Sequence, residues 1–197
     1  IADRWPAAVR FVVEHQLNEF FSERADDIGI IVQGGSYNTL LRVLERLGLA
    51  DIYGESRIPL YVMNVAYPVI DEEVLRFCEG KRAVLMVEEG QPNFIEQNVA
   101  AILRQHGSTT ALHGKDVLPK AGEYTAAQLV RGVRAFLTRV GRSAPQDYRL
   151  PERQIPVQAV SVLPAAPVHA RPPGFCTGCP ERPIFAAVIA VFITLIG

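Results

Sequence analysis

The sequence predicts an α/β fold built on a doubly wound, mostly parallel sheet with helices on both faces. Short apolar runs alternate four times with helical patterns over residues 27–140. The turns between them are short, as they are in successive strand–helix–strand units. The strand-length runs are apolar throughout, which is typical of strands that helices bury on both sides.

A leading segment, residues 1–26, precedes these units. It is expected to form a helix over residues 5–21, where apolar side chains recur at helical spacing after Pro6. Ile28–Val32 predicts the first strand because it is short and rich in β-branched residues. Ser36 is expected to cap the next helix. Further strands are expected at residues 58–65, 83–87 and 109–112. Further helices are expected from the cap residue Asp71 to Gly80, at 94–105, and at 125–137 after the cap residue Thr125.

Beyond residue 140 the composition changes. Residues 141–174 are expected to be an extended linker, because no helix can continue through prolines at this spacing: Pro145, Pro151, Pro156, Pro164, Pro167, Pro172 and Pro173. Residues 175–197 are expected to begin a second α/β domain. Every residue from Ile184 to Ile196 except Thr194 is apolar. This run is shorter than the roughly 20 residues that span a bilayer, so we expect a buried element within an internal fragment of a longer polypeptide.

Composition and charge limit the classes of function. The 197 residues include 20 Lys or Arg and 21 Asp or Glu, for a net charge of −1. Such a chain lacks the basic patch of a nucleic-acid-binding domain and the polybasic stretch of a membrane-surface protein. Three cysteines do not make a complete disulfide framework, and no signal-peptide pattern is present, so a cytoplasmic location is expected.

The strongest chemical signal is the C-x-x-C motif of Cys176 and Cys179. Two thiolates at this spacing can share one metal ion or cluster. Tetrahedral zinc and cubane iron–sulfur clusters need four ligands. Cys78 lies in a different predicted domain, on a helix where it has apolar neighbours, and His169 lies in the proline-rich linker, so neither completes the set. The pair is therefore interpreted as half of a metal or cluster site, as a redox pair, or as two small buried residues.

Other polar groups fall at the expected carboxyl edge of the sheet, where open α/β sheets bind ligands. Gly34–Ser36 could hold an anion, although a tight strand-to-helix turn is the favoured interpretation. Glu88–Glu89 could serve acid–base chemistry, although helix capping or an interface contact is favoured. His113 and Lys115 are expected in a solvated loop. No catalytic residue is assigned.

Several segments resemble the indolepyruvate ferredoxin oxidoreductases of the 2-oxoacid:ferredoxin oxidoreductase family. Arg171–Phe185 is similar to the family pattern of RPP, two residues, C-x-G-C-P and a nearby Arg and Phe. Gly29–Tyr37, Pro59–Pro68 and Val84–Glu89 are similar to the family's first three strands and their ends. With Gly114–Glu123, the resemblance covers most of the chain.

The resemblance implies that residues 27–140 are a transketolase C-terminal-like domain and that residues 175–197 begin a thiamine-diphosphate-binding domain. The parent enzyme would oxidatively decarboxylate an aryl 2-oxoacid such as indolepyruvate, pass electrons to ferredoxin and transfer the acyl group to coenzyme A. The implied cofactors are thiamine diphosphate, Mg²⁺ and a [4Fe–4S] cluster, with Cys176 and Cys179 as two cluster ligands. The implied partners include the rest of the subunit, a second oxidoreductase subunit and further copies in a homo-oligomer.

The family's activating glutamate and its Gly-Asp-Gly magnesium motif are not among these residues, so the chain alone is expected to be inactive. Two other functions remain open. One is a non-catalytic assembly module. The other is a stand-alone ligand-binding α/β domain with a zinc-binding or redox C-x-x-C.

Overall fold

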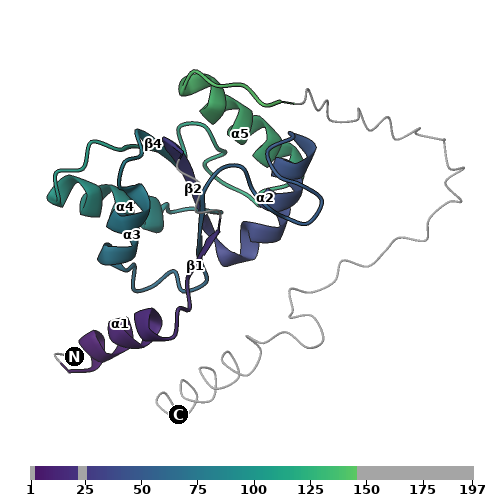
Figure 1. Cartoon of the computed structure of the whole chain (residues 1–197). Helices are drawn as coiled ribbons and strands as arrows, with labels where there is room; N and C mark the ends of the chain where they lie inside the picture. The colour runs from purple at the N-terminus through teal and green to yellow at the C-terminus, as the bar shows by residue number, and fades with distance from the viewer. Residues whose placement is uncertain (1–2, 22–25, 146–197) are drawn as a thin grey trace, which may run out of the picture. The chain divides into compact units, whose positions relative to one another are not determined.

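The computed structural model describes residues 3–21 and 26–145 (Figure 1). In these ranges the strands form one sheet of order β1-β3-β2-β4-β5. The strands are β1 (Glu19–Phe21), β2 (Ile28–Gln33), β3 (Leu60–Met63), β4 (Ala83–Val87) and β5 (Ala111–His113). Neighbouring strands are parallel except β1, which runs antiparallel to β3 at one edge. The predicted α/β fold with a mostly parallel sheet is confirmed.

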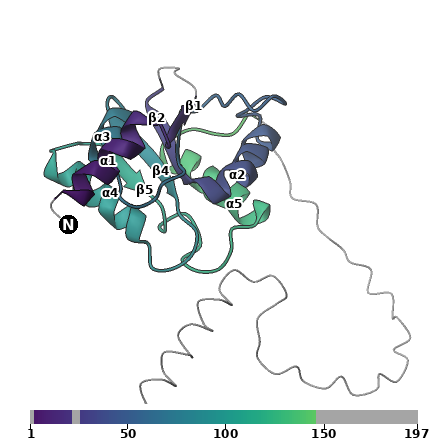
Figure 2. The same ribbon diagram turned by 90° about the horizontal axis from the view of Figure 1, so that it is seen from below.

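Helices cover both faces of this sheet. They are α1 (Arg4–Glu14), α2 (Gly34–Arg46), α3 (Asp71–Cys78), α4 (Phe94–Gln105) and α5 (Ala126–Arg139). Helices α2 and α5 pack on one face, and α3 and α4 pack on the other (Figures 1 and 2). The described part of the chain therefore has helices on both faces of the sheet, as the sequence predicts.

The alternation of strand side chains divides the core into two layers. In β2, Ile30 and Val32 belong to the cluster under α2 and α5, whereas Ile31 belongs to the cluster under α3 and α4. Successive strand residues point to opposite faces, so a strand buried on both sides must be apolar at every position. Strand β4 accordingly buries all its residues.

The order of the strands creates a switch point. Strand β2 is flanked by β3 on one side and β4 on the other. The chain leaves the carboxyl end of β2 toward α2 on one face, and it leaves β4 toward α4 on the opposite face. The two connections diverge there, which is where open α/β sheets form ligand crevices.

The predicted leading helix over residues 5–21 is wrong at its end. Helix α1 stops at Glu14, and Gln16 has a φ of 49°, which a continuing right-handed helix cannot contain. Phe20 then stacks on Tyr61 in the core layer under α3 and α4. Phe21 stacks on Tyr37 in the layer under α2 and α5. Adjacent aromatic residues that face opposite layers define a strand, and this strand pairs with β3.

The helix ends follow local sequence signals with two corrections. Asp71 does not cap α3, because the helix begins at Asp71 itself and Ile70 occupies the cap position. Ser36 does not cap α2, because the helix begins at Gly34 and Ser36 is buried in its first turn. Thr125 caps α5 as predicted: its side chain accepts from the Gln128 N–H, and the Gln128 side chain accepts from the Thr125 N–H at 2.8 Å.

Glycine permits one close approach between α5 and the loop before it. A Cβ atom at Gly132 would lie 2.2 Å from Leu118 Cδ2, and Leu118 is itself buried. Only a residue without a side chain lets the loop pack at this distance.

No helix among residues 3–21 and 26–145 is both long and apolar enough to cross a membrane. The linker expected at residues 141–174 lies outside the described ranges beyond Pro145, as does the second domain expected at residues 175–197. The domain boundaries inferred from the sequence therefore stay predictions.

Candidate functional site

The predicted metal ligands Cys176 and Cys179 lie outside the described residues, as does His169. Within residues 3–21 and 26–145, no group of three or more His, Cys, Asp or Glu side chains could hold a metal ion. Cys78 sits in the last turn of α3 and is buried in the core. Burial raises the pKa of its thiol to about 11, so the reactive thiolate is disfavoured. Cys78 is a core residue, as its apolar neighbours on the helix indicate.

Glu88 lies at the carboxyl end of β4 and caps helix α4. Its Oε1 accepts from the Ile95 N–H at 3.0 Å, and its Oε2 accepts from the Glu96 N–H at 2.8 Å. A carboxylate at a helix N-terminus satisfies amides that have no partner within the helix and interacts favourably with the helix dipole. Helix capping, favoured from the sequence for this pair of glutamates, is confirmed for Glu88.

Glu89 ties the loop after β4 to two other segments at the same edge of the sheet. Its N–H donates to Gln33 Oε1 at 2.8 Å, which ties the β4 loop to the end of β2. Its Oε1 accepts from the N–H of Tyr124, which ties the same loop to the segment before α5. Both glutamates therefore hold backbone amides of the domain itself.

Lys115 is buried, which corrects the expectation of a solvated loop. It is only 9% exposed, and its Nζ donates to Tyr124 Oη at 2.6 Å, to the Glu88 carbonyl and to the Pro119 carbonyl. Burial lowers the pKa of Lys115 and raises the pKa of Tyr124 to about 12. The reason for the burial is non-local, since its acceptors come from the β4 end and from the turn after β5.

His113 is partly buried, so the solvated-loop expectation fails for it too. Its Nδ1 lies 2.8 Å from Asp116 Oδ2, and its ring packs 5.7 Å from the ring of Phe136, between centroids. The loop after β5 is thus fastened to α5 and to the carboxyl edge.

The turn Gly34–Ser36 opens α2 at the switch point. A Cβ atom at Gly34 would lie 2.7 Å from Asn64 Oδ1, so glycine is required by the end of β3. This contact supports the interpretation of a tight strand-to-helix turn. No described side chain caps α2.

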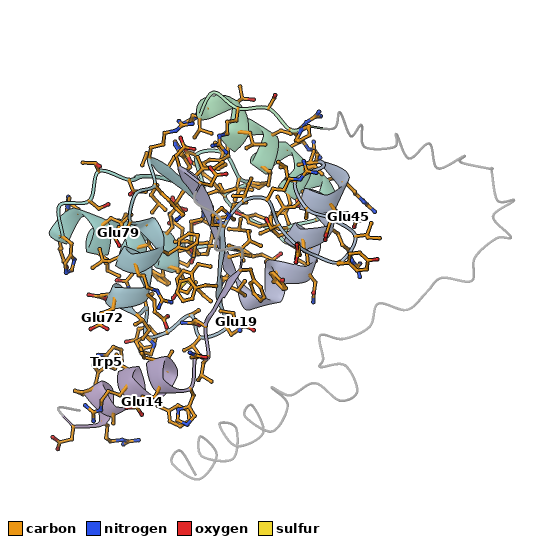
Figure 3. All side chains as sticks on the ribbon, in the orientation of Figure 1. Trp5, Glu14, Glu19, Glu45, Glu72 and Glu79 are labelled. Atoms are coloured by element: carbon orange, nitrogen blue, oxygen red, sulfur yellow. The ribbon has the colours of Figure 1, made fainter. Side chains whose placement is uncertain are left out.

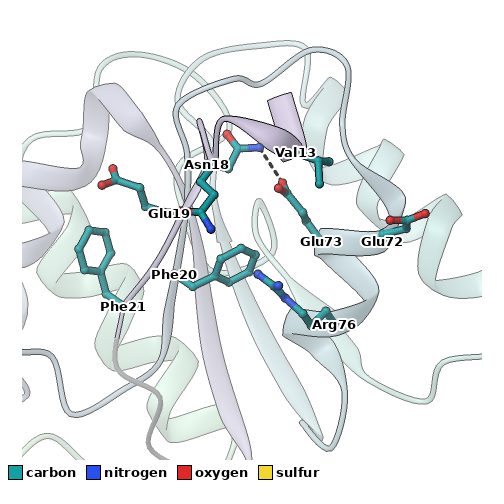
Figure 4. A pocket seen from close by; sticks show the side chains of 9 residues that line it. Val13, Asn18, Glu19, Phe20, Phe21, Glu72, Glu73 and Arg76 are labelled. Carbon is teal, nitrogen blue, oxygen red and sulfur yellow. Dashed lines mark hydrogen bonds between the residues drawn. The ribbon is translucent and has the colours of Figure 1, made fainter. Parts of the chain in front are cut away.

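The structure also shows a cavity that the sequence analysis missed. It has a volume of about 700 Å³ and lies between the end of α1, strand β1 and the start of α3 (Figure 4). Buried polar side chains form its floor: Asn18 Nδ2 donates to Glu73 Oε2 at 2.8 Å, and Tyr61 Oη donates to the same oxygen at 2.7 Å. Burial and this hydrogen bond to Glu73 raise the pKa of Tyr61 well above its ordinary value.

A signal for this cavity does exist in the sequence. Glu73 stands beside Val74 and one turn before Phe77, on the side of α3 that faces the sheet. A carboxylate on the buried side of a helix needs hydrogen-bond partners. Asn18 and Tyr61 supply them from 55 and 12 residues away, which no local pattern reveals.

The sequence of this chain is similar to part of the sequences of several curated proteins. The chain is 31% identical over 176 residues, 88% of its length, to the indolepyruvate oxidoreductase subunit IorA of Methanothermobacter marburgensis. It is 32% identical over 178 residues, 89% of its length, to IorA of Methanothermobacter thermautotrophicus. The chain is related to part of the IorA subunit. IorA of Thermococcus kodakarensis is 30% identical over 161 residues, 82% of the chain.

The resemblance inferred from the sequence motifs is thereby confirmed. The chain spans about a quarter of the length of the IorA relatives it matches, 24%, 25% and 22% of the three. No family model matches the sequence.

Proposed function

We propose that this chain is part of a thiamine-diphosphate-dependent oxidoreductase that converts indolepyruvate or a similar aryl 2-oxoacid to an acyl-CoA, with ferredoxin as the electron acceptor. The observation that carries this proposal is the similarity to IorA subunits over nearly nine-tenths of the chain. The substrate in the names of those relatives and the motifs around Cys176 support the finer assignment. A cytoplasmic location and a second oxidoreductase subunit belong to the same proposal.

The described domain would act in this enzyme by holding parts together rather than by reacting. The charged groups at its carboxyl edge bind backbone atoms of the domain itself: Glu88 caps α4, Glu89 holds Tyr124, and Lys115 holds two carbonyls and a phenol. Groups committed in this way fix the loops around the switch point.

The cofactors are proposed on the resemblance alone. Thiamine diphosphate with Mg²⁺ would supply the decarboxylation chemistry, and iron–sulfur clusters would carry the electrons. Within this chain, Cys176 and Cys179 would provide two thiolate ligands to a [4Fe–4S] cluster, with the other ligands outside it. No described residue fits such a cluster.

The first experiment measures electron transfer. The full-length subunit, assembled anaerobically with its partner subunit, should reduce a viologen dye with indolepyruvate, thiamine diphosphate, Mg²⁺ and coenzyme A. The 197-residue chain alone should reduce none. Dye reduction by the chain alone would contradict the inactive-fragment expectation, and its absence from the assembled enzyme would contradict the proposed activity.

The second experiment tests the cysteine pair. Cys176→Ser with Cys179→Ser in the full-length subunit should lower the iron content and the rate of dye reduction, with Cys78→Ser as the matched control that leaves both unchanged. Wild-type iron and activity in the double variant would show that the pair is structural. Zinc in place of iron in the wild-type protein would favour the stand-alone zinc-binding alternative.

A further inference from the structure

The cavity beside α1 has features that the proposed function does not use. Its volume of about 700 Å³ falls within the range of sites that bind small groups. Val13 of α1 and Phe20 of β1 line one side, and Glu72, Glu73 and Arg76 of α3 line the other. Figure 4 shows the side chains of Glu73 and Arg76 extending from α3 into the space beside Asn18 and Phe20.

One buried oxygen in the cavity has no hydrogen-bond donor among residues 3–21 and 26–145. Glu73 is only 8% exposed, and its Oε2 receives hydrogen bonds from both Asn18 and Tyr61. No residue within the described ranges donates a hydrogen bond to its Oε1. A carboxylate oxygen only accepts, so a group that binds there must bring a donor. A buried acceptor without a donor costs free energy, which a bound donor would recover.

The charges around this oxygen favour a cation. Glu19, Glu72 and Glu73 line the cavity against the single guanidinium of Arg76. The Arg76 Cζ atom lies 4.1 Å from the centroid of the Phe20 ring and makes no ion pair with these carboxylates in the described structure. Acidic residues in the first turn of α3 also suit the helix dipole. That effect does not account for Glu73, which is turned toward the sheet and away from solvent.

The surroundings of the cavity favour a polypeptide over a small free cation. Val13, which lines it, belongs to α1, whose apolar residues Trp5 and Phe11 are also exposed. Trp5 packs edge-on against the exposed ring of Tyr67, at 5.3 Å between centroids, and so extends the apolar surface beyond the cavity. Exposed apolar side chains beside a charged pocket are typical of a protein interface.

We propose that this cavity receives an arginine or lysine side chain from a segment of the parent enzyme outside this chain, and that the same segment covers the exposed side chains of Val13 and Trp5 on α1. Glu73 Oε1 is the acceptor at the floor, and Glu72 and Glu19 add negative charge at the rim. The inference rests on the proposed function, because the chain spans about a quarter of the length of its IorA relatives and the enzyme supplies the remaining surface.

The cation chemistry is tested on the whole 197-residue chain with N-acetylarginine amide as the probe. Its matched control is N-acetylcitrulline amide, which has nearly the same shape without the charge. In nitrogen-15 NMR spectra, the Asn18 side-chain amide and the Val65 amide, which donates to Asn18 Oδ1, should shift saturably with the arginine compound only. Equal shifts with both compounds, or none with either, would overturn the proposal.

A variant pair locates the site. Glu72 and Glu79 are both exposed and lie at opposite ends of α3 (Figure 3), but only Glu72 lines the cavity. Glu72→Gln should weaken binding of the arginine compound about two- to five-fold, as expected for one partly exposed charge pair. Glu79→Gln should leave it unchanged. Glu72 is used because replacing Glu73 would also break its bonds to Asn18 and Tyr61. An unchanged affinity in Glu72→Gln would place the cation elsewhere.

The source of the cation is tested by hydrogen exchange. In the assembled enzyme, residues 16–21 and 72–76 should exchange more slowly than in the 197-residue chain, and residues around Glu79 should not change. Equal exchange in both would mean that the cavity is open in the enzyme, so that only a free cation could bind. This readout is independent of dye reduction: protection without activity contradicts the proposed reaction, and activity without protection contradicts the docking.

Discussion

Cys78 provides the sharpest test of the described core. The variant carrying Cys176→Ser and Cys179→Ser leaves Cys78 as the only thiol of the chain. Burial raises the pKa of this thiol from 9.0 to about 11. At pH 8 the reactive thiolate is therefore about 100-fold scarcer than in the unfolded chain, since each pKa unit is a factor of ten. The side chain is also enclosed under α3 and α4, which hinders a reagent further.

The assay is the reaction of the double variant with Ellman's reagent, followed by absorbance with and without denaturant. We expect one thiol to react quickly in guanidinium chloride and more than about 100-fold more slowly in native buffer. A third replacement, Cys78→Ala, gives the baseline. Rapid reaction of one full equivalent in native buffer would refute the burial of Cys78 and, with it, the packing of α3 on the sheet.

The same thiol makes stability depend on alkaline pH. The folded pKa lies above the unfolded value, so the unfolded chain loses its proton first as pH rises. The stability contributed by Cys78 is present below pH 9 and is lost between about pH 9 and about pH 11. Urea denaturation at several pH values should show this decline, and Cys78→Ala should reduce it. A slope that is unchanged in Cys78→Ala would assign the decline to other groups.

Three further perturbations test other parts of the domain by urea denaturation. Gly132→Ala should lower the free energy of unfolding by about 1–2 kcal/mol, because crowding the buried loop costs more than the gain in helix propensity. The control Gly35→Ala has open space around it and should be neutral or stabilising. Equal effects of the two substitutions would contradict the close approach at Gly132. Lys115→Met should cost about 1–3 kcal/mol through lost hydrogen bonds, and no loss would show that the amine is dispensable. The hydrogen bond from Arg82 lowers the pKa of Asp27, so stability should fall as pH drops below about 3.8, and less so in Arg82→Gln.

Those parts of the fold that depend on local pattern could be predicted from the sequence. Strand β4 and helix α4 match their predicted bounds, 83–87 and 94–105. The first is a short run of buried apolar residues, and the second repeats apolar side chains every three or four positions up to Gly107, which has a φ of 66°. Each of these signals lies within the element itself.

Residues whose structure depends on distant partners could not be predicted. Residues 15–21 suit a helix by spacing, but the open edge of β3 and the rings of Tyr61 and Tyr37 make Phe20–Phe21 a strand. Lys115 follows a turn and is charged, both of which favour exposure. Its burial requires the Glu88 carbonyl, 27 residues earlier, and the Tyr124 hydroxyl, nine residues later. Neither the spacing of apolar residues nor the composition of the sequence shows which distant residues will become hydrogen-bond partners.

The division between satisfied and unsatisfied polar groups separates two roles within the described domain. At the switch point, where a ligand crevice would be expected from topology, Glu88, Glu89 and Lys115 all hold atoms of the domain's own loops. At the opposite side of β3, Glu73 keeps one buried oxygen that no residue of the described ranges donates to, beside exposed apolar side chains of α1. The first arrangement rigidifies the domain, and the second calls for a partner. In the proposed enzyme, such a domain would fix the position of its neighbours, and Cys176 and Cys179 are the residues of this chain that we propose take part in the chemistry.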